Sequence, residues 1–103
     1  MNFDDFGRFS DPALLILSSL AEGSKHGYGI MNDIKTLTGV RMGAGTLYGA
    51  LTRLENAGLI KAVASQDRRR PYQLTAKGIA SLREQLTLLQ KLASTGLKRL
   101  ASQ

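Results

Sequence analysis

The sequence predicts a mainly α-helical fold: three short helices form a core, a two-stranded hairpin follows, and one long helix comes last. Apolar residues recur at helical spacing in four segments, glycine directly follows two of them, and two short β-prone runs enclose a charged tip. A chain of 103 residues has room for one core. We expect residues 11–75 to form it, with 1–10 as an N-terminal arm and 76–103 as the terminal helix.

The first predicted helix begins at Asp11-Pro12. An aspartate accepts hydrogen bonds from the free amides of a helix start, and a proline at the first position has no amide to leave unpaired. Residues 14–17 and Leu20 then make this segment apolar on most sides. We therefore expect this helix to lie at the centre of the core.

Two amphipathic helices are predicted within residues 25–59. Each has one apolar stripe, formed by Ile30, Ile34 and Leu37 in the first helix and by Leu47, Ala50, Leu51, Leu54 and Ala57 in the second. Gly39 and Gly58 follow these stripes, where a left-handed cap favours glycine. Two short helices joined by a small turn are typical of a helix-turn-helix.

The second of these helices opens with small residues and hydroxyl groups. We expect its exposed leading edge to consist of Met42, Gly43, Ala44, Gly45, Thr46, Tyr48 and Gly49. A helix start with so little bulk can approach another molecule closely. Thr46 and Tyr48 are then able to reach base edges or adjacent phosphates in a groove of nucleic acid.

A β-hairpin is predicted next, from residues 59–65 and 71–74 around a polar tip. The tip contains three consecutive arginines, Arg68, Arg69 and Arg70. A hairpin directly after a helix-turn-helix is a wing, and guanidinium groups on it suit phosphates or a narrow minor groove. The alternative is a solvated loop whose charges protect the edge of the sheet.

The last predicted helix is capped by Thr75 and carries a wide apolar face. Its seam follows steps of four and three residues, and further apolar positions widen it beyond what a lone terminal helix can hide. A second copy of the chain would cover this face, so we predict a homodimer. The predicted interface residues are Ile79, Leu82, Leu86, Leu89, Leu92 and Ala93. The alternative is a helix that folds back on its own core.

Positive charge is concentrated after the first helix. Residues 1–24 carry one arginine and four acidic side chains, whereas residues 25–103 carry thirteen basic and four acidic ones. A polyanion is the expected partner, because neutralising phosphates releases condensed counterions. The alternative is a basic surface that only keeps the protein soluble.

Several function classes are disfavoured. The chain has no cysteine and a single histidine, His26, so we expect no disulfide, no metal site and no cofactor. No Ser-His-Asp set or acid–base pair of carboxylates is recognisable, which argues against an enzyme. The longest apolar run, residues 13–17, is short against the ~20 residues of a membrane span. The N-terminus is acidic, without a basic leader, so a cytoplasmic location and no membrane partner are expected.

The motifs in combination resemble those of one bacterial family. They are His26-Gly27-Tyr28, Gly45-Thr46-Leu47-Tyr48 with Ala50-Leu51 and Arg53-Leu54-Glu55, Gly58-Leu59-Ile60, and Arg69-Arg70 through Tyr72, Leu74-Thr75 and Gly78. Over roughly residues 12–80 this set resembles the PadR family of transcriptional regulators. The single terminal helix is similar to that of the small PadR subgroup.

The resemblance implies a winged helix-turn-helix dimer that binds a palindromic operator in double-stranded DNA as a repressor, often released by small aromatic or hydrophobic effectors. The second motif helix would enter the major groove and the preceding helix would face the backbone. The residues expected to contact DNA are His26, Tyr28, Ala44, Gly45, Thr46, Tyr48, Arg53, Arg68, Arg69 and Arg70.

The chain departs from the family pattern at the start of the second motif helix. Gly43-Ala44 stands where many members have Ser-Pro, and Gly49 where they usually have Pro, so this helix should start less rigidly. Tryptophan is absent, so a stacking pocket for planar drugs is not implied. Two other functions remain open for a winged helix, an RNA-binding module and a protein interaction module, since fold does not fix function.

Overall fold

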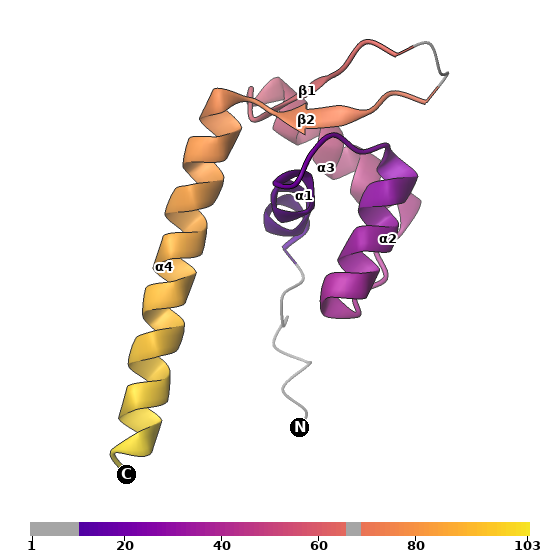
Figure 1. The fold of residues 1–103 in the computed structure, drawn as a ribbon. Helices are drawn as coiled ribbons and strands as arrows, with labels where there is room; N and C mark the ends of the chain where they lie inside the picture. The colour runs from indigo at the N-terminus through magenta and orange to yellow at the C-terminus, as the bar shows by residue number, and fades with distance from the viewer. Residues whose placement is uncertain (1–10, 66–68) are drawn as a thin grey trace.

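The computed structural model describes residues 11–65 and 69–103. Its elements follow the chain in the order α1 (Pro12–Leu20), α2 (Gly27–Thr38), α3 (Ala44–Asn56), β1 (Ile60–Ala62), β2 (Tyr72–Leu74) and α4 (Ala76–Ala101). Figure 1 shows α1, α2 and α3 grouped beneath the hairpin, with α4 standing beside them. The predicted class, a mainly helical winged helix-turn-helix with a terminal helix, is confirmed. The N-terminal arm lies outside the described residues.

Helix α1 is the centre of the core, as predicted. The side chain of Asp11 accepts a hydrogen bond from the amide of Ala13 at 3.1 Å, and Pro12 occupies the first turn. The helix packs against α2, α3 and α4. Four of its apolar side chains are buried, namely Leu15, Ile16, Leu17 and Leu20.

The two motif helices each bury one stripe and end at the predicted glycines. Gly39 and Gly58 have φ angles of 76° and 77°, a left-handed conformation that glycine adopts without a steric penalty. The prediction of the stripes is wrong at their last positions, because Leu37 is 63% exposed and Ala57 is also exposed. After the end of α2, Val40 from the turn packs partly against the core.

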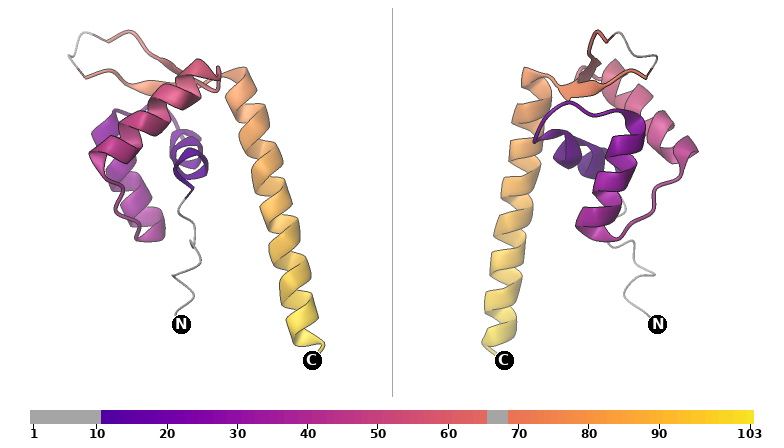
Figure 2. Two further views of the ribbon diagram at one scale, coloured as in Figure 1. Left: turned by 180° about the vertical axis from the view of Figure 1, so that it is seen from behind. Right: turned by 45° about the vertical axis from the view of Figure 1, so that its right-hand side comes forward.

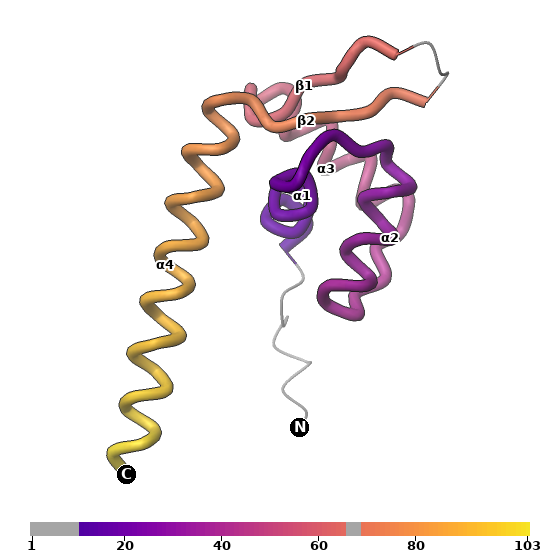
Figure 3. The backbone as a smooth tube through the Cα atoms, in the orientation of Figure 1, coloured from indigo at the N-terminus to yellow at the C-terminus, as the bar shows by residue number. Residues whose placement is uncertain are grey.

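The hairpin is shorter than predicted but lies where expected. Ile60 pairs with Leu74 and Ala62 with Tyr72 in an antiparallel ladder, and the amide of Val63 adds a bond to the carbonyl of Pro71 at 2.8 Å. We call β1, β2 and their connection the wing. Figure 3 shows the described parts of this connection projecting away from α4, on the side where α2 and α3 lie.

The wing is also hydrogen-bonded to the segment between α1 and α2. The amide of Lys25 donates to the carbonyl of Tyr72 at 3.1 Å, and the amide of Tyr72 donates to the carbonyl of Lys25 at 2.9 Å. These two bonds tie the base of the wing to the start of the helix-turn-helix.

Helix α4 begins against the end of α3 and then leaves the domain. Thr75 caps it as predicted, since its hydroxyl accepts from the amide of Gly78 at 3.0 Å and donates to the carbonyl of Gly58 at 2.6 Å. Its 26 residues span roughly 39 Å at 1.5 Å per residue. Both views in Figure 2 show most of this length standing apart from the other helices.

One predicted interface residue belongs to the core instead. Leu82 was expected on a water-exposed stripe of the monomer, but it is 4% exposed and packs into the cluster formed by α1, α2 and α3. Helix α4 packs against α1, and Leu82 is covered within one chain. The remaining large apolar residues of α4 are exposed: Ile79, Leu86, Leu88, Leu89, Leu92, Leu97 and Leu100. None of the helices in the described ranges is long and apolar enough to cross a membrane.

Candidate nucleic-acid interface

Three elements meet around a cavity of about 340 Å³ on the side of the wing. The start of α2 contributes His26, Gly27 and Tyr28, α3 contributes Tyr48, and the wing contributes Arg69, Arg70 and Tyr72. The structure thus brings together five residues that the sequence predicted as DNA contacts: His26, Tyr28, Tyr48, Arg69 and Arg70. Three phenol groups and two guanidinium groups around one cavity form a donor-rich, positively charged surface.

Tyr48 and Gly27 hold two of these elements in contact. The phenol oxygen of Tyr48 lies so close to Gly27 that a Cβ built there would stand 2.7 Å from it. Tyr48 remains 52% exposed and Tyr28 is 65% exposed, so both side chains are accessible to a partner over part of their surface. The close approach requires the absence of a side chain at residue 27.

The first turn of α2 faces the same cavity. His26 is its N-cap residue, but its side chain makes no capping hydrogen bond. Its Nδ1 atom is buried without a hydrogen-bond partner among the described residues. The free amides at the start of a helix carry partial positive charge, which adds to that of the two arginines.

The start of α3 has the small, exposed edge that the sequence predicted. Ala44, Gly45 and Thr46 are exposed, and a Cβ built on Gly45 would meet no atom within 4 Å. Met42 departs from the prediction, because it packs partly against the core. Arg53 is exposed two turns along the same helix, with its guanidinium group lying back over Gly49.

The wing carries two of the predicted arginines on its described part. Arg69 and Arg70 are both exposed, and Nη2 of Arg70 lies 3.9 Å from Oε2 of Glu55 on α3. An exposed pair at this distance contributes little to stability but keeps the guanidinium group near α3. Arg68 lies outside the described residues. Within the described ranges no group of histidine, aspartate and glutamate side chains could hold a metal ion.

A polar cluster behind this surface was not predicted from the sequence. Lys25 Nζ lies 3.3 Å from Oδ2 of Asp33 and 2.7 Å from Oε1 of Glu22, and the hydroxyl of Ser19 donates to Asp33 at 2.7 Å. The hydrogen bond from Ser19 lowers the pKa of Asp33, burial opposes this, and Lys25 lowers that pKa further. The available sequence signal was the pair Ser18-Ser19 at the end of an otherwise apolar helix.

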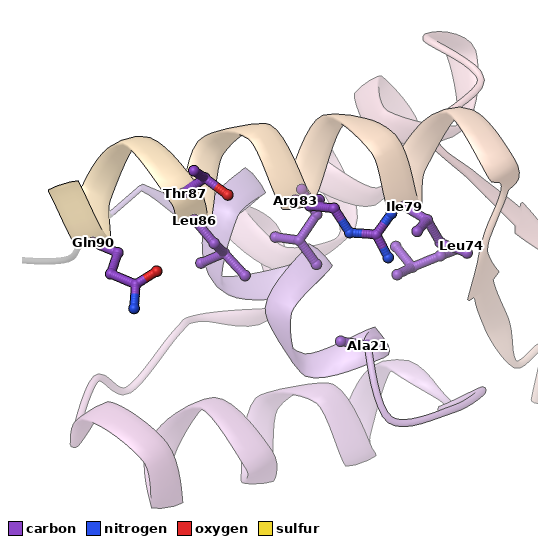
Figure 4. Close-up of a pocket in the computed structure, with 8 residues that line it drawn as sticks. Ala21, Leu74, Ile79, Arg83, Leu86, Thr87 and Gln90 are labelled. Carbon is purple, nitrogen blue, oxygen red and sulfur yellow. The ribbon is translucent and has the colours of Figure 1, made fainter.

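A second concave surface lies between α4 and the domain. This groove has a volume of about 360 Å³. Figure 4 shows side chains of α4 along it, with Ala21 across from them and Leu74 beside Ile79. The predicted interface residues Ile79, Leu82 and Leu86 line it. Leu89, Leu92 and Ala93 lie further along the exposed part of α4.

The model of the transcriptional regulator PadR-like family matches residues 16–84. This match covers both motif helices, the wing and the start of α4. The chain belongs to the PadR family. Members of this family are transcriptional regulators, so the resemblance expected from the motifs is confirmed.

Solved PadR-like structures share the arrangement over most of the chain. A transcriptional regulator from Clostridium thermocellum is 29% identical, with a TM-score of 0.75 and coverage of 95% of this chain and 96% of that one. Bacillus subtilis PadR in complex with operator DNA is 25% identical with a TM-score of 0.64. This second match covers 77% of the present chain and 47% of the Bacillus protein.

A curated relative shows the same segment in a longer protein. The chain is 44% identical over 71 residues to an uncharacterized 37.1 kDa protein in transposon TN4556 of Streptomyces fradiae. The match covers 69% of this PadR chain and spans about a fifth of that relative, 21% of its length.

Proposed function

We propose that this protein is a sequence-specific regulator of transcription that binds duplex DNA with α3 and the wing. The observation that carries the proposal is the cavity at which the starts of α2 and α3 meet Arg69 and Arg70 of the wing. The operator complex of Bacillus subtilis PadR, a relative with the same fold, supports it. The protein would act by binding alone, in the cytoplasm.

The two halves of this surface suit different parts of a duplex. Arg69, Arg70, Tyr28 and the amides of α2 are suited to phosphates, which position a protein without reading sequence. The start of α3 lacks bulk, so it can enter the major groove and bring Thr46 to the base edges. We expect specificity from α3 and most of the salt-dependent affinity from the wing.

A homodimer formed through α4 completes this proposal. Leu88, Leu89 and Leu92 are 56%, 37% and 69% exposed, and fully burying one such side chain is worth about 1.5–3 kcal/mol. Burying the exposed parts of these side chains on two chains would offset much of the entropic cost of association, about 4–15 kcal/mol. A dimer would set two α3 helices about 34–36 Å apart, one turn of DNA, and so match a palindromic operator.

Repression would follow from occupation of a promoter, with the groove of Figure 4 as the place for an effector. This groove combines apolar Leu74, Ile79 and Leu86 with the guanidinium group of Arg83. A small hydrophobic or aromatic molecule bound there would change the position of α4 and shift the dimer between two states that differ in affinity for DNA.

The function is tested by selecting genomic fragments on the purified protein and titrating the enriched sequence as duplex DNA and as single-stranded RNA. We expect the duplex to bind more tightly, with two chains per site. Tighter binding of RNA would favour an RNA-binding module. Failure to bind either nucleic acid would favour a protein interaction module.

A further inference from the structure

Lys25 connects three elements at a point directly behind the candidate DNA surface. Its ammonium group donates to the carbonyl of Ser19 at the end of α1 and lies 3.3 Å from Oδ2 of Asp33 on α2. Its backbone amide and carbonyl both pair with Tyr72 of β2, at 3.1 and 2.9 Å. One residue therefore holds the end of α1, the middle of α2 and the base of the wing.

Two partners of this ammonium group are partly withdrawn from water, whereas Glu22, whose Oε1 lies 2.7 Å from Nζ, is 71% exposed. The side chains of Lys25 and Asp33 are 16% and 22% exposed, and Ser19 is 1% exposed. Removing one member of such a cluster leaves the other charge without compensation, whereas replacing the whole cluster by apolar groups is often neutral for stability. Because the cluster as a whole adds little to stability, we look for its role in the positions that it gives to the elements it joins.

The geometry links Lys25 to the residues that face DNA. His26 follows it directly as the N-cap of α2, and Tyr72, its backbone partner, lines the cavity beside Arg69 and Arg70. A shift of Lys25 relative to Asp33 would therefore change the distance between the wing and the starts of α2 and α3.

We propose that Lys25, held by Asp33 and Ser19, is a positioning residue that couples the wing to the helix-turn-helix. It contacts no nucleic acid itself. Its role is to set the width of the cavity, so that wing arginines and the start of α2 contact the same stretch of backbone. This inference rests on the proposed function, because the coupled surfaces act together only when DNA binds both.

The test is a double-mutant cycle on duplex affinity that combines Lys25→Met with Arg69→Ala/Arg70→Ala. Methionine keeps much of the length of lysine and removes the charge. Lys35→Met is the matched control, because it removes the same charge from an exposed position on α2. We expect Lys25→Met to weaken duplex binding about tenfold more than Lys35→Met, within the range for coupled neighbours. The effect of the wing substitutions should be clearly smaller in the Lys25→Met background.

Hydrogen exchange without DNA gives an independent readout. Lys25→Met should speed amide exchange in residues 72–74 relative to the buried part of α1, and Lys35→Met should not. If Lys25→Met fails to fold, Ser19→Ala serves in the same cycle, because it removes the hydroxyl that orients Asp33 and keeps both charges.

The outcomes separate the inference from the proposed function. In one outcome the parent binds duplex DNA while the double-mutant cycle is additive and amide exchange in β2 is unchanged. That result would overturn the coupling role of Lys25 and would not contradict the proposed function. A parent that binds no duplex would contradict the proposed function, and exchange in β2 would then decide the coupling. Non-additivity with faster exchange in β2 supports the inference.

Discussion

The phenol oxygen of Tyr48 on α3 rests against Gly27, the first residue of α2. A Cβ at residue 27 would lie 2.7 Å from this oxygen, which is closer than Cβ atoms in folded proteins approach other atoms. The start of the helix that we assign to the major groove is therefore docked on the preceding helix where a side chain is missing. Any side chain at residue 27 must displace Tyr48.

We predict that Gly27→Ala weakens duplex binding and leaves stability nearly unchanged. The half-exposed Tyr48 can swing away, and alanine favours the helix, so the free energy of unfolding should change by less than about 1 kcal/mol. The free energy of duplex binding should weaken by about 1 kcal/mol, the net value of the one hydrogen bond that a displaced Tyr48 phenol would no longer make to DNA. Gly29→Ala is the control, because its Cβ would have only an ordinary contact at 3.8 Å. Equal affinities of the two variants, measured by anisotropy titration, would show that the position of Tyr48 is irrelevant.

A second close approach joins α4 to the end of α3. A Cβ at Gly78 would lie 1.9 Å from the carbonyl oxygen of Leu59, a backbone atom that cannot move aside. Gly78→Ala should therefore lower the free energy of unfolding by about 1–3 kcal/mol or more. Gly96→Ala, on the same helix with open space around it, should raise it by about 0.5–1 kcal/mol. Chemical denaturation measures both, and equal stability of the two variants would refute the packing described at Leu59.

The lowered pKa of Asp33 leads us to predict how the stability of the protein depends on pH. Its pKa is lowered in the folded protein, first by the hydrogen bond from Ser19 and then by Lys25, while burial opposes the shift. Its stabilising contribution is therefore present above the unfolded pKa of about 3.9 and is lost as pH falls through the folded value. We expect the difference in unfolding free energy between the parent and Asp33→Asn to shrink on acidification below about pH 4. A constant difference from pH 7 to pH 2 would contradict the role of Asp33.

The order of the elements follows from local patterns in the sequence. Asp11-Pro12 and Thr75 determine two helix starts, Gly39 and Gly58 determine two ends, and all four were predicted correctly. These signals are local because a capping group bonds atoms only a few residues away. The assignment of Leu82 failed because helical spacing identifies an apolar face and does not tell which molecule covers it.

The candidate site was predictable in its members and not in its assembly. Tyr28, Tyr48 and Arg70 were identified from motifs, and the structure brings them to one cavity. The contact of Tyr48 with Gly27 and the polar cluster around Lys25 both depend on how α2 is oriented against α3 and the wing. Such distances come from tertiary packing, which a pattern along the chain does not encode.

We predict that the protein dimerises through the exposed leucines of α4. Leu89→Glu with Leu92→Glu places two charges on each chain at positions beyond the groove, so the fold of one chain should be preserved. We expect monomers that bind operator duplex weakly, as measured by sedimentation and titration. Ala80→Glu with Lys91→Gln has the same change in net charge on the opposite face by helical spacing, and should remain dimeric. A dimeric leucine double variant would remove α4 from the interface.

The salt dependence of duplex binding by Arg69→Ala/Arg70→Ala is the most direct test of the assigned DNA surface. Lys98→Ala/Arg99→Ala is the control, with the same loss of charge at the exposed end of α4. If both wing arginines neutralise phosphates, the slope of log affinity against log salt should become shallower by about 1.8, at 0.9 per phosphate, and should not change in the control. Equal slopes for the two double variants would contradict the assignment of the wing to the surface that binds DNA.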